Sequence, residues 1–199
     1  MRAAMPTKGQ ETRNHILKES RRLFTLKGFH NTSINEIITV TGVKKGNLYY
    51  HFPSKEELGL AVLVGAKDEF FKIFDDSLVG DNSALKIINS CNFIMAMMQQ
   101  TNFVGGCLFG NTALEMIDSN PRFGMIIQEV FSHWTGRIEH ELINATKSGL
   151  LNNPVPPDAL ATAIVAILEG GIMLSRVYKN KNALEDCILS IHTLIEAPK

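Results

Sequence analysis

Cysteine, aromatic residues and long apolar runs are all scarce in this sequence. Its three cysteines are far apart in the chain, which argues against a disulfide framework and against a cysteine-based zinc site. The longest apolar run, 159–168, is much shorter than the roughly 20 residues that span a bilayer, and no secretory signal follows the N-terminal charge. Aromatic residues make up only 8% of the chain, but a hydrophobic share of 45% is ordinary for a globular protein and excludes disorder. We expect a cytoplasmic protein with no membrane segment, no metal and no cofactor.

The net charge is zero, but the charges are unevenly distributed along the chain. Residues 1–55 hold ten of the 20 basic residues and three of the 20 acidic ones, a balance of 10 − 3 = +7, so residues 56–199 carry 10 − 17 = −7. A basic N-terminal part on an acidic remainder is typical of a nucleic-acid reader joined to another domain, although a merely solvated basic face has the same composition.

Apolar residues recur at helical spacing from one end of the chain to the other, and the alternation typical of strands is absent. The sequence predicts an all-α protein of about nine helices. Their expected ranges are a helix closed at 27–28, then 34–40, 44–52, 55–74, 83–100, 109–117, 121–149, 159–178 and 184–195.

Two short helices in the basic part are expected to be joined by a tight turn. Ser33 with Glu36, and Ser54 with Glu57, have the spacing of capping boxes that open helices. Between the two short helices, Gly42 can adopt the left-handed conformation of a tight break. A pair of short helices joined by a glycine-containing turn predicts a helix-turn-helix. We therefore divide the chain into a DNA-binding domain over 1–55 and a larger domain over 56–199.

The second short helix has few apolar positions with which to anchor itself. Val43, Leu48 and Phe52 are its candidates for inward-facing residues. Its remaining side chains are poor material for a core but suit a DNA major groove, which presents donors, acceptors and thymine methyls. They are Lys44, Lys45, Asn47, Tyr49, Tyr50 and His51.

The segment GVKKGNLYYHFPSKEEL at 42–58, preceded by GFHNTSI at 28–34, resembles the DNA-binding domain of TetR/AcrR family transcriptional regulators over about 12–61. The resemblance implies a homodimeric repressor that binds double-stranded palindromic operator DNA. By position it implies base contacts from Lys45, Gly46, Asn47 and Tyr49. The phosphate contacts that it implies are Thr32, Ser33, Tyr50, His51 and Lys55, with Lys44 assigned to either class. Ser33 and Lys55 also stand at expected helix starts, where free N–H groups favour an anion.

The larger domain is rich in bulky, adaptable apolar residues, which suit either an ordinary core or a pocket for a small hydrophobic effector. The family resemblance favours the pocket. Asn111 and Glu115, one helical turn apart, are expected to orient the effector. The full expected lining is Phe70, Phe74, Phe93, Met97, Phe103, Cys107, Asn111, Glu115, Phe131 and Trp134.

The segment GGCLFGNTALE at 105–115 resembles a Gly-Cys-x-x-Gly-Asn segment found in a subset of these regulators. Because Cys107 is expected near a helix start, the helix dipole could favour its thiolate. An alternative function is therefore a repressor that senses electrophiles or redox changes through Cys107. A small buried hydrophobic cysteine is the other interpretation.

Small residues between 159 and 171 would let a partner helix approach closely, and similar segments of the family form the dimer interface. The expected interface residues are Ile164, Leu168, Gly171, Ile172 and Leu189. An enzyme is the rival class, but the phosphate-binding, nucleophile-elbow and dinucleotide motifs are missing. A helical adaptor would explain the larger domain but not the basic helix-turn-helix.

Overall fold

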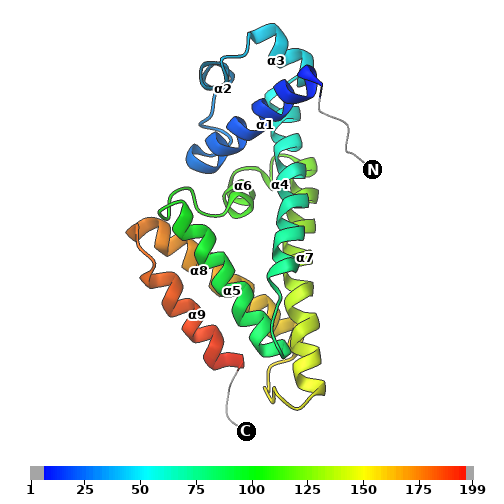
Figure 1. Ribbon diagram of the computed structural model, residues 1–199, viewed down its shortest axis with the longest axis vertical. Helices are drawn as coiled ribbons and strands as arrows, with labels where there is room; N and C mark the ends of the chain where they lie inside the picture. The colour runs from blue at the N-terminus through cyan, green and yellow to red at the C-terminus, as the bar shows by residue number, and fades with distance from the viewer. Residues whose placement is uncertain (1–6, 196–199) are drawn as a thin grey trace.

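The computed structural model describes residues 7–195, and within that range the chain forms nine α-helices and no strand, as the sequence predicts (Figure 1). The helices are α1 Lys8–Lys27, α2 Ile34–Thr41, α3 Lys45–His51, α4 Lys55–Ser77, α5 Ser83–Gln100, α6 Leu108–Met116, α7 Pro121–Lys147, α8 Pro157–Tyr178 and α9 Asn182–Ile195. We refer to α1–α3 as the head and to α4–α9 as the body.

Local signals set the helix starts, although the expected capping boxes form only in part. Ser33 and Ser54 each accept a hydrogen bond from the N–H three residues on, at 3.1 Å. Their partner glutamates do not return the bond, because Glu36 pairs with Lys27 and Glu57 with Arg122. These cations lower the pKa of both carboxyls, chiefly through the hydrogen bonds.

The head packs onto the body through a shared core. One cluster of buried side chains joins Ile16 and Leu23 of α1 and Leu48 of α3 to Phe109 of α6 and Phe123 of α7. A second cluster lies lower in the molecule, among α4, α5, α7, α8 and α9. The division at 55/56 thus coincides with the start of α4, while apolar packing continues across it.

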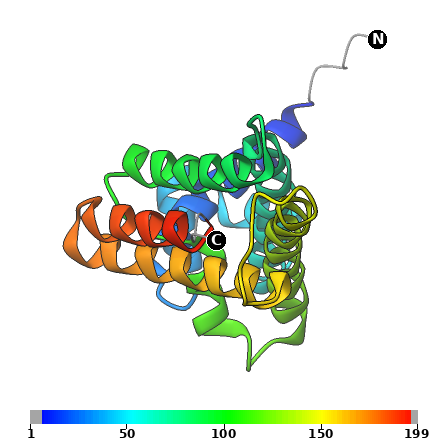
Figure 2. The same cartoon turned by 90° about the horizontal axis from the view of Figure 1, so that it is seen from below.

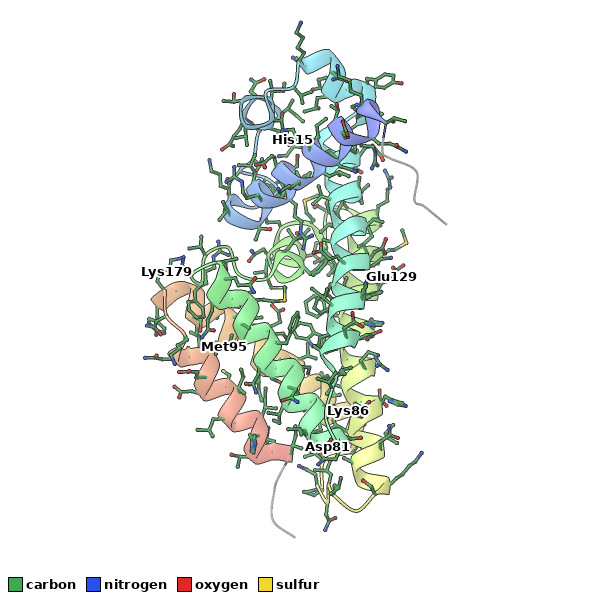
Figure 3. The ribbon with its side chains drawn as sticks, in the orientation of Figure 1. His15, Asp81, Lys86, Met95, Glu129 and Lys179 are labelled. Atoms are coloured by element: carbon green, nitrogen blue, oxygen red, sulfur yellow. The ribbon has the colours of Figure 1, made fainter. Side chains whose placement is uncertain are left out.

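The body is built around two long helices, α4 and α7, that run side by side below the head (Figure 1). Seen from below, α5, α9 and α8 lie in that order beside the α4–α7 pair, with α9 between α5 and α8 (Figure 2). Near the lower end, Lys86 of α5 reaches Glu141 of α7 with an Nζ–Oε2 distance of 3.5 Å (Figure 3).

Helix α8 is the one described helix long and apolar enough to cross a membrane. Its apolar residues include Leu160, Ile164 and Leu168, and these belong to the lower core, where α8 packs against α7 and α9. Core packing therefore accounts for its composition.

Candidate nucleic-acid interface and ligand cavity

The outer face of α3 is exposed, as a DNA-reading helix requires. Leu48 is fully buried and Phe52 nearly so, so these two anchor the helix. The side chains of Lys44, Lys45 and Asn47 are exposed. These polar groups have no structural role in the head's core, which leaves them available to a groove.

The two tyrosines and His51 differ in exposure. Tyr50 is 83% exposed and Tyr49 39%, while His51 is half-buried and its ring centroid lies 5.1 Å from that of Tyr50. Gly46 is exposed, and a Cβ built there would meet nothing within 4 Å. The side chains of Tyr49, Tyr50 and His51 all lie on α3, and the outer surface of that helix is not covered by any described residue.

The turn before α3 has the backbone that the sequence predicts. Gly42 adopts a φ of +66°, in the left-handed region, and caps α2 by donating its N–H to the carbonyl of Ile38 at 2.9 Å. His15 of α1 stabilises the same corner, because its Nε2 lies 3.1 Å from the Thr41 carbonyl oxygen (Figure 3). The angle between α2 and α3 is thus held by both local conformation and α1.

Thr32 is not placed as a phosphate contact. Its side chain is fully buried, and its hydroxyl donates to the Gly28 carbonyl at 2.8 Å. Ser33, next to it, is exposed at the N-cap of α2. Of the two expected phosphate contacts only Ser33 therefore has an exposed hydroxyl, because the Thr32 hydroxyl already donates to a carbonyl inside the head.

Lys55 is held against the head instead of reaching outward. Its Nζ donates to the His30 carbonyl at 3.3 Å and lies 4.5 Å from the centroid of the Phe29 ring. Partial burial lowers the pKa of Lys55, and the nearby carboxylate of Glu115 opposes that effect. A phosphate contact from Lys55 would require its ammonium group to leave these partners.

A junction between head and body forms around Glu115, near the end of α6. The Glu115 carboxylate accepts a hydrogen bond from the His30 N–H at 2.8 Å, and His30 Nε2 lies 3.2 Å from the Glu115 carbonyl oxygen. Gly28, at φ +86°, leaves room for this carboxylate, because a Cβ there would collide with Oε1 of Glu115. Glu115 thus fixes the loop that leads into the helix-turn-helix.

A cavity of about 620 Å³ lies where the head meets the body. Five of the ten residues expected to line a pocket do so: Phe70, Met97, Cys107, Phe131 and Trp134. Other apolar lining residues include Ile73, Ile94, Met98, Phe109 and Ile172. Its wall is thus mostly apolar and aromatic, as suits an organic ligand.

The other five expected residues lie outside the cavity wall. Phe74 is fully buried in the lower core, Phe103 packs against that core, and Phe93 is half-buried on α5. Asn111 bonds Gly105 and Arg176, and Glu115 bonds His30. The expectation that these two polar residues orient an effector does not match this geometry, since both are committed to structural hydrogen bonds.

The head contributes a wall of the cavity that the sequence analysis did not anticipate. Lys18, Arg21, Arg22, Thr25 and Leu26 of α1 all line it. The spacing of Lys18, Arg21, Arg22 and Thr25, at i, i+3, i+4 and i+7, puts them on one helix face. That periodicity was visible in the sequence, but nothing in it indicated that this face meets the body.

Cys107 caps α6, as expected, but its environment does not favour a thiolate. Its sulfur accepts a hydrogen bond from the Gly110 N–H at 3.3 Å. Burial raises the pKa of Cys107 well above its usual range, and the neighbouring carboxyl of Glu169 raises it further. Burial also raises the pKa of Glu169. Desolvation and the nearby acid therefore oppose the helix dipole, and the surroundings of Cys107 favour its thiol form.

Four of the five residues expected at a dimer interface lie inside the chain's own core. Ile164 and Leu168 are fully buried, and Ile172 is 5% exposed. Gly171 lets α9 approach α8, because a Cβ there would lie 2.9 Å from Leu184 Cδ1. Only Leu189, 67% exposed, is open to a partner. The exposed apolar residues in the last turns of α8 are Met173, Leu174, Val177 and Tyr178.

Comparison with known proteins finds two family models that match this chain. Residues 16–62 match the family model "Bacterial regulatory proteins, tetR family", and residues 84–191 match "Tetracyclin repressor-like, C-terminal domain". The chain is 31% identical over 182 residues to the HTH-type transcriptional regulator LmrA of Bacillus subtilis (strain 168), covering 87% of this chain and 91% of that protein. It is 25% identical over 176 residues to the HTH-type transcriptional repressor DhaR of Mycobacterium sp. (strain GP1), covering 87% and 86%.

A solved structure is also similar along nearly the whole chain. The crystal structure of a TetR transcriptional regulator from Chloroflexus aurantiacus J-10-FL superposes with a TM-score of 0.87 at 32% sequence identity, covering 96% of each chain. Regulators of this kind bind operator DNA and act as dimers, and the relatives are transcriptional regulators rather than enzymes. The chain belongs to the TetR family of bacterial transcriptional regulators.

Proposed function

We propose that this protein is a cytoplasmic homodimeric repressor that leaves a palindromic operator when a small hydrophobic molecule enters the cavity. The exposed face of α3, with Lys45, Gly46, Asn47 and Tyr49, would read base edges in the major groove. The remaining contacts, to phosphates, are assigned to Lys44, Ser33, Tyr50 and His51. Two such heads about 34–36 Å apart would read two half-sites of a palindrome.

The observation that carries the proposal is that one cavity is walled by both head and body. Helix α1 lines it from the head, while α6 begins in its wall at Leu108 and ends at the Glu115 junction with His30. Figure 1 shows α6 lying between the head and the lower body. A ligand that displaces α1 or α6 would therefore change the position of the head directly.

This coupling is a two-state equilibrium with different affinities for ligand and DNA in the two states. A ligand shifts the equilibrium only by its differential affinity, and linkage requires operator DNA to weaken ligand binding by the same factor. Small motions near the cavity would change the separation of the two heads in a dimer. Binding to two half-sites of an operator depends on that separation.

The test is binding of the purified protein to DNA from upstream of its own gene, compared with a scrambled duplex at near-physiological salt. We expect at least about 10³-fold tighter binding to the upstream DNA. The triple variant Lys45→Ala/Asn47→Ala/Tyr49→Ala should abolish the preference while keeping its helical circular dichroism. Equal binding to both duplexes by the wild-type protein, repeated after removal of bound small molecules by refolding, would overturn autoregulation through this operator.

The alternative repressor that senses electrophiles through Cys107 has less support. A reactive cysteine is ordinarily a thiolate in an electropositive setting. Cys107 has the carboxyl of Glu169 beside it, and its pKa is raised. The position of Cys107 is explained by the cavity, because Cys107 is one of the residues in the cavity wall.

A further inference from the structure

We propose that the effector is an amphipathic organic anion, whose apolar body enters the cavity and whose anionic group is held by Lys18 and Arg22 of α1. This inference rests on the proposed function, because it specifies the chemistry of the molecule that the regulator senses. It commits to one ligand class, a carboxylate or similar anion on an apolar chain or ring system.

The charged side chains around the cavity are of one sign. Three cationic side chains line it, Lys18, Arg21 and Arg22, and no acidic residue is among the described residues of its wall. All three come from one face of α1. Two carboxylates, those of Glu69 and Glu19, pair with Arg21 and Arg22, so one positive charge is in excess, and it would attract an anion but not a neutral ligand.

The cations on α1 still have binding capacity. Arg21 pairs with Glu69, and Arg22 binds Glu19 through Nε at 3.0 Å, so the two terminal nitrogens of Arg22 have no hydrogen-bond partner among residues 7–195. Lys18 has no ion-pair partner among residues 7–195. The rim of the cavity therefore holds more positive than negative charge.

Burial of the lining side chains increases from the rim of the cavity to its interior. Lys18 and Arg22 are exposed, whereas Trp134 is 3% exposed and packs with Phe70 and Phe131. An anionic group at the rim keeps contact with water and avoids the cost of burying a charge. The apolar part of the ligand then replaces water against the aromatic wall.

The aromatic end also has one unused polar group. The indole N–H of Trp134 is buried and has no hydrogen-bond partner among the described residues.

Because Trp134 is the chain's one tryptophan and lines the cavity, its fluorescence reports occupancy. We would titrate the full chain with decanoate, 1-decanol and decylammonium, each below its micelle concentration, at neutral pH and low ionic strength. The three probes share one apolar chain and differ in charge. We expect decanoate to bind about tenfold more tightly than 1-decanol, and decylammonium most weakly.

Variants of α1 separate the charge effect from the apolar effect. Lys18→Gln and Arg22→Gln should each weaken decanoate binding about two- to fivefold, as for an exposed ion pair, and leave 1-decanol unchanged. Lys8→Gln is the matched control, since Lys8 also lies exposed on α1 but away from the cavity. Lys18→Glu should reduce the decanoate preference further and improve decylammonium binding.

The proposal is overturned if decanoate gives no Trp134 response, if 1-decanol or decylammonium binds as tightly, or if Lys18→Gln weakens decanoate and 1-decanol equally. The titration contains no DNA, so these failures would leave operator binding intact. Conversely, a preference for decanoate in a protein that fails to distinguish upstream from scrambled DNA would preserve the anion site and remove the proposed regulatory role.

Discussion

The carboxylate of Glu115 accepts a hydrogen bond from the backbone N–H of His30, with an Oε2–N distance of 2.8 Å, across 85 positions of sequence. Through this bond the last turn of α6 holds the loop that precedes the helix-turn-helix. Since α6 starts in the cavity wall, the same helix connects the cavity with the loop before the helix-turn-helix.

Glu115→Ala should loosen the connection between the cavity and the head. We expect a loss of about 1–2 kcal/mol in the free energy of unfolding, because the His30 N–H loses its partner, and a smaller effector-induced drop in operator affinity. Urea unfolding and operator titrations with and without the effector measure both. Leu114→Ala is the control, since Leu114 is 90% exposed. An undiminished effector response in Glu115→Ala would exclude α6 as the route.

Asn47→Ala and Lys55→Ala should affect operator binding in different ways. Asn47→Ala should cost about 1–3 kcal/mol, mainly at one base position, because an amide can pair with a base edge. Lys55→Ala should leave the salt dependence of operator binding unchanged, because the Lys55 ammonium group is held by the His30 carbonyl and the Phe29 ring. Titrations of single-base operator variants at several salt concentrations distinguish these patterns. A salt dependence flattened by about one unit in Lys55→Ala would instead make Lys55 a phosphate contact.

Thr32→Val should destabilise the protein without changing the salt dependence of DNA binding. The buried Thr32 hydroxyl donates to the Gly28 carbonyl at 2.8 Å, and valine of similar shape would leave that carbonyl unpaired. We expect a loss of about 1–3 kcal/mol in the free energy of unfolding. Ser33→Ala, at the exposed N-cap, serves as the comparison. A flatter salt dependence for Thr32→Val than for Ser33→Ala would restore Thr32 as a phosphate contact.

Glu169→Gln should change how stability depends on pH. Burial raises the pKa of Glu169 above its usual 4.5, so the folded state holds the proton more tightly than the unfolded state. The protonated carboxyl's contribution to the free energy of unfolding is fully present below about pH 4.5. It is lost as the pH rises through the pKa that Glu169 has in the folded state. The stability of Glu169→Gln relative to the wild type should therefore rise with pH over that interval.

Urea unfolding at several pH values from 4 to 8 measures this difference. Glu185→Gln, which changes an exposed carboxylate on α9, should show no comparable trend. A difference between Glu169→Gln and the wild type that stays constant across the range would contradict the raised pKa.

Leu189→Lys should dissociate a dimer built on the exposed surface of α8 and α9. Leu189 is 67% exposed, so a lysine there should leave the monomer folded, while it would place a charge in the interface. Sedimentation at several protein concentrations measures the shift. By contrast, Leu168→Ala should cost about 2–5 kcal/mol of folding stability, since Leu168 is fully buried. A Leu189→Lys protein that stays dimeric would place the interface elsewhere.

Much of the fold followed from local sequence signals. The serines that cap α2 and α4, the left-handed Gly42 and the buried anchors Leu48 and Phe52 all act within a few residues of their position. Helical periodicity is equally local, which is why an all-α chain and an exposed polar face on α3 could be predicted.

The sequence by itself thus determined the helices, the helix-turn-helix and the family to which the chain belongs. Tertiary structure alone decided which helix face meets which neighbour: it buried Thr32, drew Lys55 to His30, turned Gly171 toward α9 and placed the cations of α1 at the cavity. The reason is physical. Periodicity states which side chains share a face, but what covers that face depends on contacts between segments far apart in the chain, as with Glu115 and His30.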